Sequence, residues 1–415
     1  MSSALLTDRY ELTMLDAALR SGLAGRRAVF EVFARRLPPG RRFGVVAGQG
    51  RLHALLQDFV FGDDELAGLR FVSDDTRDWL AGRSLGGDIT AYAEGETFFP
   101  GSPVLTVESC FGEGLLLETL VLSVLNHDSA VASAAARMVL AAEGRPLIEM
   151  GSRRTHEQAA VAAARAAYVA GFALTSNLEA GRRHGIPTAG TSAHAFTLAA
   201  ADEKQAFRAQ LDAQGMQTTL LVDTFDTEQG IRNAIEVAGP GLGAVRLDSG
   251  DLVEETRRAR TLLDQLGAPD TKVVVTGDLD EWAIAALAAT PADSYGVGTS
   301  VVTGSGAPTA GFVYKLVAIA ASDDPDAPLH PVAKTSVGKA TVGGRKWAAR
   351  LPDGEVVRRT PDGFPPGARL LQAPLGPEDV EAARTRCAAS LAELPPDARR
   401  LAKGEPCWTA ELVEG

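Results

Sequence analysis

Residues 244–278 have the sequence AVRLDSGDLVEETRRARTLLDQLGAPDTKVVVTGD, which contains one complete strand–helix–strand unit. The apolar run Ala244–Leu247 predicts a buried strand, the amphipathic stretch Leu252–Leu266 predicts a helix, and Lys272–Val275 predicts the next strand. A helix between two strands is the crossover connection that parallel strands need. The stretch therefore predicts a sheet covered by helices.

The same alternation continues on both sides, from about residue 145 to residue 319. The candidate strands are Pro146–Met150, Phe172–Thr175, Ile186–Ala189, Thr218–Val222, Ala244–Leu247, Lys272–Val275, Ser294–Val297 and Phe312–Ile319. The helical patterns between them are Thr155–Ala170, Glu203–Gln214, Glu228–Ala238, Leu252–Leu266 and Glu281–Ala289. Eight successive units favour a closed α/β barrel, although periodicity alone does not exclude an open doubly wound sheet.

The flanking regions have different patterns. Before the barrel, Tyr10–Leu19 predicts a helix, Arg27–Phe33 a strand, and Ile89–Ser109 a β-rich stretch. After it come short runs such as Lys346–Leu351, separated by charged and Pro-rich spacers. We therefore expect an α/β protein with an N-terminal α+β domain (residues 1–126), an irregular (β/α) barrel (127–329) and a C-terminal segment (330–415) that packs on the N-terminal domain.

Composition narrows the class of protein. With 415 residues and 45% hydrophobic content, the chain can bury a large core, but its apolar runs are too short or too interrupted to span a bilayer. We expect a cytoplasmic protein, because residues 1–10 also lack a signal-peptide pattern. The net charge of -12 argues against nucleic acid as a partner. The three cysteines, at positions 110, 387 and 407, fit neither a disulfide framework nor a zinc site.

In a barrel, functional side chains gather where strands end. The first candidate strand is followed by Gly151-Ser152-Arg153-Arg154-Thr155-His156. Its small residues allow close approach of the backbone, the arginines offer forked donors, and the loop opens a helix whose N-terminus favours anions. The loop therefore suits a phosphate or a diphosphate, and an arginine pair on a solvated loop is the alternative.

The third candidate strand is followed by Gly190-Thr191-Ser192-Ala193-His194-Ala195-Phe196. A single histidine among small and hydroxylated residues is either a catalytic group or a structural one with satisfied hydrogen bonds. Its position at a strand end favours the catalytic interpretation.

After the fifth strand, alternation puts Arg246 and Asp248 on the same side of an extended chain. A cation and a carboxylate would then point into one mouth of the barrel. A salt bridge that serves only stability is the alternative. Asp223 and Asp226 follow the fourth strand at a comparable position.

Two later strands end in glycine-containing turns, Thr276-Gly277-Asp278 and Gly296-Val297-Gly298-Thr299-Ser300. Free backbone N–H groups late in a barrel are typical of a phosphate site. The sequence has no P-loop and no metal-ligand spacing of cysteine or histidine, so we expect no metal site made by the protein alone. Mg²⁺ could still enter with a diphosphate, since it binds phosphate oxygens together with one or two carboxylates.

Taken in order, these segments resemble the nicotinate phosphoribosyltransferase family over nearly the whole chain. The matching segments are Leu5–Met14, Gly151–His156, Thr175–Asn177, Gly190–Phe196, Leu221–Thr224, Arg246–Asp251 and Tyr295–Thr303. The resemblance implies a type II phosphoribosyltransferase fold and a homodimer with active sites shared between subunits. It also implies the reaction: nicotinate and 5-phosphoribosyl 1-diphosphate give nicotinate mononucleotide and diphosphate, coupled to ATP hydrolysis through a phosphohistidine, in NAD salvage.

The resemblance also assigns roles to residues. His194 matches the phosphorylated histidine, Thr191 lies beside nicotinate, and Arg246 contacts the nicotinate side. Tyr10 matches the aromatic residue that stacks on the pyridine ring from the neighbouring subunit. The positions that match contacts to the phosphoribosyl group are Asp248, Gly277, Asp278, Gly298 and Thr299. Arg153 and Arg154 suit the departing diphosphate with Mg²⁺, and Asp248 suits the positive charge that develops on the ribose.

Substrate choice depends on position 176. Relatives that use nicotinamide carry an Asp near this position, and this chain has Ser176 and Asn177, which favours nicotinate. A quinolinate phosphoribosyltransferase would need a denser cluster of Arg and Lys and has no phosphorylated histidine. A non-catalytic phosphate-binding barrel is the alternative from another class, but His194, Arg246 and Asp248 are all present.

Overall fold

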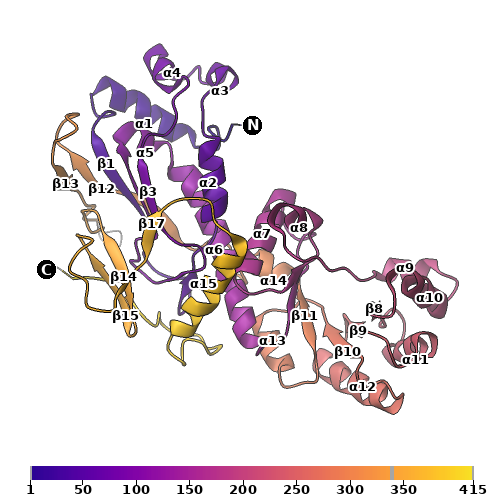
Figure 1. The fold of residues 1–415 in the computed structure, drawn as a ribbon. Helices are drawn as coiled ribbons and strands as arrows, with labels where there is room; N and C mark the ends of the chain where they lie inside the picture. The colour runs from indigo at the N-terminus through magenta and orange to yellow at the C-terminus, as the bar shows by residue number, and fades with distance from the viewer. Residues whose placement is uncertain (1, 337–340, 414–415) are drawn as a thin grey trace. The chain divides into compact units, whose positions relative to one another are not determined.

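The computed structural model describes residues 2–336 and 341–413. The chain folds into two compact units (Figure 1). The first unit contains residues 1–133, 308–398 and 402–415, and the second contains residues 134–307 and 399–401. The long helix α6 (Glu118–Ala141) begins in the first unit and ends in the second.

The first unit is built on an antiparallel sheet to which both ends of the chain contribute. Its strands are, in spatial order, β13 (Leu329–Pro331), β12 (Phe312–Ala320), β1 (Arg27–Ala34), β5 (Leu105–Cys110), β3 (Asp88–Tyr92) and β17 (Gln372–Pro374). A second sheet orders β16 (Arg369–Leu370), β14 (Trp347–Leu351), β15 (Gly354–Arg358) and β18 (Glu411–Leu412), and β2 (Gly44–Val45) pairs with β4 (Thr97–Phe98). The predicted packing of the C-terminal segment on the N-terminal domain is confirmed.

Helices cover this unit and close its core. They are α1 (Arg9–Arg20), α2 (Gln49–Gln57), α3 (Asp63–Ala67), α4 (Asp74–Leu80), α5 (Phe111–Leu115) and α15 (Val380–Glu393). Helix α1 is amphipathic, and it buries Leu12 and Leu15 in the same core as Phe30, Phe312 and Tyr314. The rings of Phe30 and Tyr314 stack with centroids 5.0 Å apart, which fixes β1 against β12.

The second unit contains a curled parallel sheet. Its spatial order is β7 (Leu174–Thr175), β6 (Leu147–Glu149), β11 (Ser294–Val297), β10 (Lys272–Val275), β9 (Ala244–Leu247) and β8 (Thr219–Leu221). In chain order, the last strand of this sheet, β11, pairs with its first strand, β6, so the sheet closes on that side. Among the residues described, no ladder joins the segment around Thr188 to β8, so the barrel is open there. The predicted class, an irregular α/β barrel with an N-terminal α+β domain, is confirmed.

Helices alternate with these strands. They are α7 (Glu157–Val169), α8 (Leu178–His184), α9 (His194–Ala199), α10 (Glu203–Gln214), α11 (Thr227–Ala238), α12 (Leu252–Gln265), α13 (Glu281–Leu287) and α14 (Thr299–Val302). Figure 1 shows α12 and α13 beside strands β9 to β11, as a crossover helix requires. Helix α7 is alanine-rich and buried almost along its whole length, because small side chains let it lie close to its neighbours.

Two strand predictions were wrong. The run Phe312–Ile319 is not the eighth barrel strand: it is β12, which pairs antiparallel with β1 in the first unit. The run Ile186–Ala189 forms only an isolated bridge between Thr175 and Thr188. Pro187 lies inside this run, and a proline has no N–H group to give to a ladder.

Candidate active site at the strand ends of the second unit

His194 is the first residue of the short helix α9, after the loop formed by residues 190–193. Its Nε2 atom lies 3.2 Å from Oδ1 of Asp223, which follows β8. The Asp223 side chain is only 1% exposed, whereas the His194 side chain is 39% exposed. A buried carboxylate therefore orients an imidazole ring whose other nitrogen, Nδ1, is not used by this contact.

Asp223 also holds the turn after β9. Its second oxygen, Oδ2, accepts hydrogen bonds from the backbone N–H of Asp248 at 2.8 Å and from Oγ of Ser249 at 2.7 Å. The sequence placed Asp223 at a strand end without assigning it a role. The structure shows it as the residue that joins the His194 segment to the Asp248 turn.

Arg246 belongs to β9, and its Nη1 donates to Oγ1 of Thr191 and to the backbone oxygen of Ser192. Its Nη2 lies 3.8 Å from Oδ1 of Asp248, which is too long for a hydrogen bond. Burial lowers the pKa of Arg246, while the carboxylates of Asp248 and Asp223 act in the opposite direction. The guanidinium stays charged, since arginine keeps its proton in proteins, and it holds the Thr191 loop.

Asp248 comes directly after β9, and its carboxylate is 35% exposed. Oδ1 accepts a hydrogen bond from Oγ1 of Thr276 at the end of β10. The predicted meeting of Arg246 and Asp248 on one side of the strand end is therefore confirmed. Both side chains stay partly exposed, at 13% and 35%, so each can also face a ligand.

The turn after β6 carries Arg153 and Arg154, both of which are exposed. Its first residue, Gly151, has no room for a side chain, because a Cβ atom there would lie 2.2 Å from Cγ1 of Val302. Asn177 of the neighbouring turn donates from Nδ2 to Oγ of Ser152 at 3.0 Å, next to Ser176. The charge of Arg153 contributes to lowering the pKa of Arg246, so the two guanidinium groups act on one another.

The two glycine-containing turns lie after β10 and β11. Gly277 has φ +107°, and a Cβ atom there would lie 2.4 Å from the backbone oxygen of Asp248. Asp278 follows with φ +46° and an exposed side chain. Gly298 precedes α14, whose first residue is Thr299. The Gly277 turn therefore lies against the backbone of Asp248, and the Gly298 turn lies near Met150 at the end of β6.

One predicted site residue, Tyr10, lies in the first compact unit, on α1, and is 44% exposed. Partial burial raises the pKa of its hydroxyl, and the carboxylates of Glu118 and Glu11 raise it further. Tyr10 is therefore a neutral aromatic ring at neutral pH.

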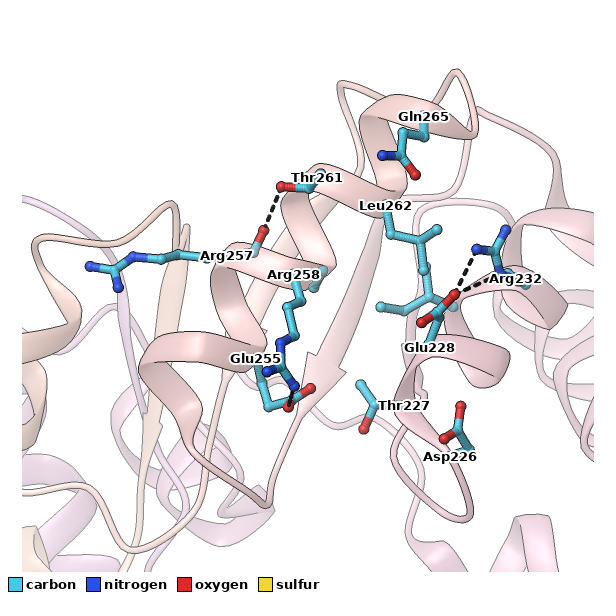
Figure 2. Close-up of a pocket in the computed structure, with 12 residues that line it drawn as sticks. Asp226, Thr227, Glu228, Arg232, Glu255, Arg257, Arg258, Thr261, Leu262 and Gln265 are labelled. Carbon is cyan, nitrogen blue, oxygen red and sulfur yellow. Dashed lines mark hydrogen bonds and ion pairs between the residues drawn. The ribbon is translucent and has the colours of Figure 1, made fainter.

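A separate groove of about 490 Å³ lies between α11 and α12 (Figure 2). Its charged side chains are largely engaged with one another: Arg232 pairs with Glu228 at 2.7 Å, and Arg258 pairs with Glu255 at 3.2 Å. Of the strand-end residues named from the sequence, Asp226 lines it, where its carboxylate caps α11 by accepting from the N–H of Gln229. The groove between the outer helices is therefore distinct from the strand-end site.

Side chains that could ligate a metal ion are dispersed over the described structure. In residues 2–336 and 341–413, no group of three or more His, Cys, Asp or Glu side chains is arranged to hold a metal ion. Within the same residues, no helix is long and apolar enough to cross a membrane.

The chain is similar to known proteins in its sequence and in its fold. The chain matches the nicotinate phosphoribosyltransferase N-terminal domain over residues 5–126 and the quinolinate phosphoribosyl transferase C-terminal domain over residues 131–305. It is 55% identical to a nicotinate phosphoribosyltransferase of Mycobacterium tuberculosis, over 99% of this chain and 95% of the relative. A nicotinate phosphoribosyltransferase of Bacillus subtilis is 38% identical, over 84% of this chain and 73% of the relative.

A solved structure gives the same result for the fold. The crystal structure of human nicotinic acid phosphoribosyltransferase superimposes with a TM-score of 0.81, covers 98% of each chain and is 26% identical. Identity over nearly the full length and a shared fold together show that this chain belongs to the nicotinate phosphoribosyltransferase family.

Proposed function

We propose that this protein converts nicotinate and 5-phosphoribosyl 1-diphosphate into nicotinate mononucleotide and diphosphate in NAD salvage, and that ATP hydrolysis through a phosphohistidine at His194 drives the reaction. The observation that carries the proposal is the strand-end network in which Asp223 contacts both His194 and the Asp248 turn. Relatives named as nicotinate phosphoribosyltransferases, at up to 55% identity, support the pyridine substrate.

The transfer step requires stabilisation of charge at two places. The pyridine nitrogen attacks the anomeric carbon of the ribose, and the bond to the diphosphate breaks with its electron pair leaving on oxygen. Positive charge develops on the ribose and negative charge on the diphosphate, so a fixed carboxylate and fixed cations are both useful. Asp248, held by Thr276, is suited to the ribose, and Arg153 and Arg154 to the diphosphate. When bound with the diphosphate, Mg²⁺ would supply further positive charge at the leaving group.

The phosphoryl step uses the other nitrogen of His194. With Nε2 facing Asp223, Nδ1 is the nitrogen that attacks the terminal phosphorus of ATP, and ADP leaves. The Asp223 carboxylate stabilises the positive charge that the ring gains during this attack. Water later hydrolyses the phosphohistidine to phosphate and regenerates the free ring.

Arg246 and Ser176 support nicotinate over nicotinamide. A carboxylate on the pyridine ring would be attracted to Arg246, whose Nη2 has no hydrogen bond among the described residues. Asn177 is occupied by Ser152 and by the N–H of Ala180, and Ser176 offers no acidic acceptor for an amide. A cation whose Nη2 is held only by a long ion pair therefore favours the acid.

A steady-state assay of nicotinate, nicotinamide and quinolinate, each with and without ATP, tests the substrate. We expect kcat/KM for nicotinate to exceed the other two by at least about 100-fold, the scale of one lost charge pair in a binding site. Equal rates with nicotinamide or quinolinate would contradict the assignment. Incubation with labelled ATP should give acid-labile, base-stable label on wild type, and equal labelling of His194→Ala would contradict the phosphohistidine.

We also infer a homodimer with shared active sites, in which Tyr10 of one subunit serves the site of the other. Its support is the exposed ring of Tyr10 beside the exposed apolar residues Leu5, Leu6 and Met14. Mixing inactive Tyr10→Ala and His194→Ala variants, under conditions in which subunits exchange, should restore part of the activity. Full activity of a strictly monomeric species in sedimentation-matched assays would contradict the shared site.

A further inference from the structure

Glu149 is a buried carboxylate that the mechanism above does not use. It is the last residue of β6, is 1% exposed, and lies inside an apolar run. Among the residues that the structure describes, no Lys, Arg or His forms an ion pair with it. A buried acid without a cationic partner is costly, so its hydrogen bonds must account for its presence.

Both oxygens of Glu149 accept hydrogen bonds from turns at the strand ends. Oε1 accepts from the backbone N–H of Gly151, and Oε2 accepts from Oγ1 of Thr175 at 2.6 Å. The same Thr175 Oγ1 accepts from the N–H of Asn177 at 3.0 Å. One carboxylate thus fixes the start of the Arg153 turn and the start of the Asn177 turn.

The turn after β11, at Gly298, also lies close to Gly151 and the Glu149 carboxylate. A Cβ atom on Gly151 would lie 2.9 Å from the backbone oxygen of Gly298 and 3.0 Å from Oε1 of Glu149. The N–H of Met150 donates to the oxygen of Val297 at 2.7 Å, which aligns β6 with β11 just below. The turns after β6, β7 and β11 therefore converge above the Glu149 carboxylate.

An ionised carboxylate accepts hydrogen bonds from both groups as they are arranged here. It accepts on both oxygens, whereas the amide of a glutamine accepts on one and donates on the other. Burial raises the pKa of Glu149, and the hydrogen bonds from Thr175 and Gly151 lower it in part. A glutamine could keep the Gly151 contact, but it would have to donate to Oγ1 of Thr175, which reverses that hydrogen bond.

We propose that Glu149 is a positioning residue of the phosphoribosyl diphosphate site, which fixes the Gly151–Arg154 turn and, through Thr175, the Ser176–Asn177 turn. The inference rests on the proposed function, because it assigns that turn to the diphosphate. Glu149 acts from beneath the turn, and Arg153 and Arg154 carry the charge that faces the ligand. Loss of the carboxylate should weaken binding of the diphosphate substrate most, because Arg153 and Arg154 face it, and should affect nicotinate binding less, through the Ser176–Asn177 turn alone.

The test is a full kinetic comparison of Glu149→Gln with wild type, with both substrates varied. We expect the KM for 5-phosphoribosyl 1-diphosphate to rise about tenfold, the scale of one charge-assisted hydrogen bond, and the KM for nicotinate to change less than about twofold. Calorimetric titration of the folded variant with 5-phosphoribosyl 1-diphosphate should show the same loss of affinity. Thr175→Val removes the second contact at nearly constant shape and should act in the same direction, whereas Thr175→Ser should resemble wild type.

Glu203→Gln is the matched control, because Glu203 is another buried carboxylate of this unit that accepts from Nδ2 of Asn233 at 2.8 Å. It joins α10 to α11 and should leave both KM values unchanged even if stability falls. Equal changes in both KM values of folded Glu149→Gln, or no change in either, would overturn the inference. If Glu149→Gln does not fold, Thr175→Val decides by the same criterion. Wild-type turnover in the same assay tests the proposed function separately.

Discussion

Each compact unit contains an arginine beside a carboxylate, and the two pairs differ in how completely they are enclosed. In the first unit, Arg350 and Glu355 are 2% and 0% exposed and 3.1 Å apart. In the second unit, Arg246 and Asp248 are 13% and 35% exposed and 3.8 Å apart. The first pair is sealed within the protein, and the second is held open at a strand end.

The hydrogen bonds around the two pairs also differ. Oε1 of Glu355 accepts from Tyr92 and Ser102, and Arg350 donates to the side chain and backbone of Thr97. These contacts join β3 and β4 to the C-terminal strands β14 and β15. At the strand ends, by contrast, neighbouring loops hold Arg246 and Asp248 without bringing them together. A closed ion pair stabilises the fold, and an open one offers its charges to a ligand.

The largest expected effect is on the closed pair. Glu355→Gln keeps the shape but leaves the buried Arg350 charge with only the longer contact to the partly exposed Glu393, at 3.5 Å, so we expect a loss of about 3 kcal/mol of unfolding free energy. Chemical denaturation measures it, and kcat of the remaining folded enzyme should be close to wild type. Replacing both residues by Met should cost less than Glu355→Gln alone. A folded Glu355→Gln variant with a greatly reduced kcat would remove the distinction between the two pairs.

The open pair should show the opposite behaviour. We expect Asp248→Asn to lower kcat/KM about 100- to 1000-fold, because a fixed negative charge next to the reacting ribose is lost. The unfolding free energy should change by less than about 1 kcal/mol, since this carboxylate is partly exposed and its ion pair is long. Denaturation and steady-state kinetics on one preparation measure both. A large loss of stability with unchanged kcat/KM would show that the pair is structural.

A second ion pair of the first unit, between the buried Asp128 and Arg51, predicts how the stability of the protein depends on pH. Burial raises the pKa of Asp128, but Arg51, at 2.9 Å, and His127 outweigh it, so the pKa lies below its ordinary value. A depressed folded pKa stabilises the protein above the unfolded pKa of about 4, and this stability is lost as pH falls through the folded pKa. Asp128→Asn should therefore cost about 2 kcal/mol at pH 7, and less as the pH falls below about 4. A cost that stays constant from pH 7 to pH 3 would contradict this account.

The smallest expected effect concerns Asp223. This carboxylate is buried, like Glu355, but it contacts the partly exposed His194 of the candidate site. Asp223→Asn keeps a hydrogen bond to the ring but removes the charge, so we expect the rate of ATP-dependent labelling to fall about tenfold. Rapid-quench labelling measures this rate. His194→Ala, which has no label, and Ser249→Ala, which should label normally, are the controls. Labelling of Asp223→Asn at the wild-type rate would leave Asp223 with a purely structural role.

Local sequence predicted the strands that local patterns define. The bounds of β9, β10 and β11 agree with prediction, because each is a short apolar run ended by polar or glycine residues. The run that became β12 was misassigned, since nothing local in Phe312–Ile319 tells a strand of one sheet from a strand of the other. Its partner, β1, is chosen by pairing between the two ends of the chain, as in Ala28 with Ile319.

In the candidate site, too, sequence predicted the contacts between residues close in the chain and missed those between distant loops. Arg246 and Asp248 were found because they are two residues apart at the end of one strand. The contact between His194 and Asp223 depends on how two loops fold back on each other, and no spacing encodes it. Glu149 gave a local signal, an acid inside an apolar strand, but its partners at Gly151 and Thr175 belong to the folded turns.

The pairing of β1 with β12 also sets an order of events during synthesis. β1 leaves the ribosome early and can pair with β5, but its other partner, β12, is made only after the whole parallel sheet of residues 147–297. Domains generally fold as their chain becomes complete, so the barrel unit can form while the first unit still lacks a central strand. Until then β1 has an unpaired, apolar edge, which is a template for aggregation. Nascent chains stalled after residue 307 should therefore contain a protease-resistant barrel and a first unit that depends on chaperones.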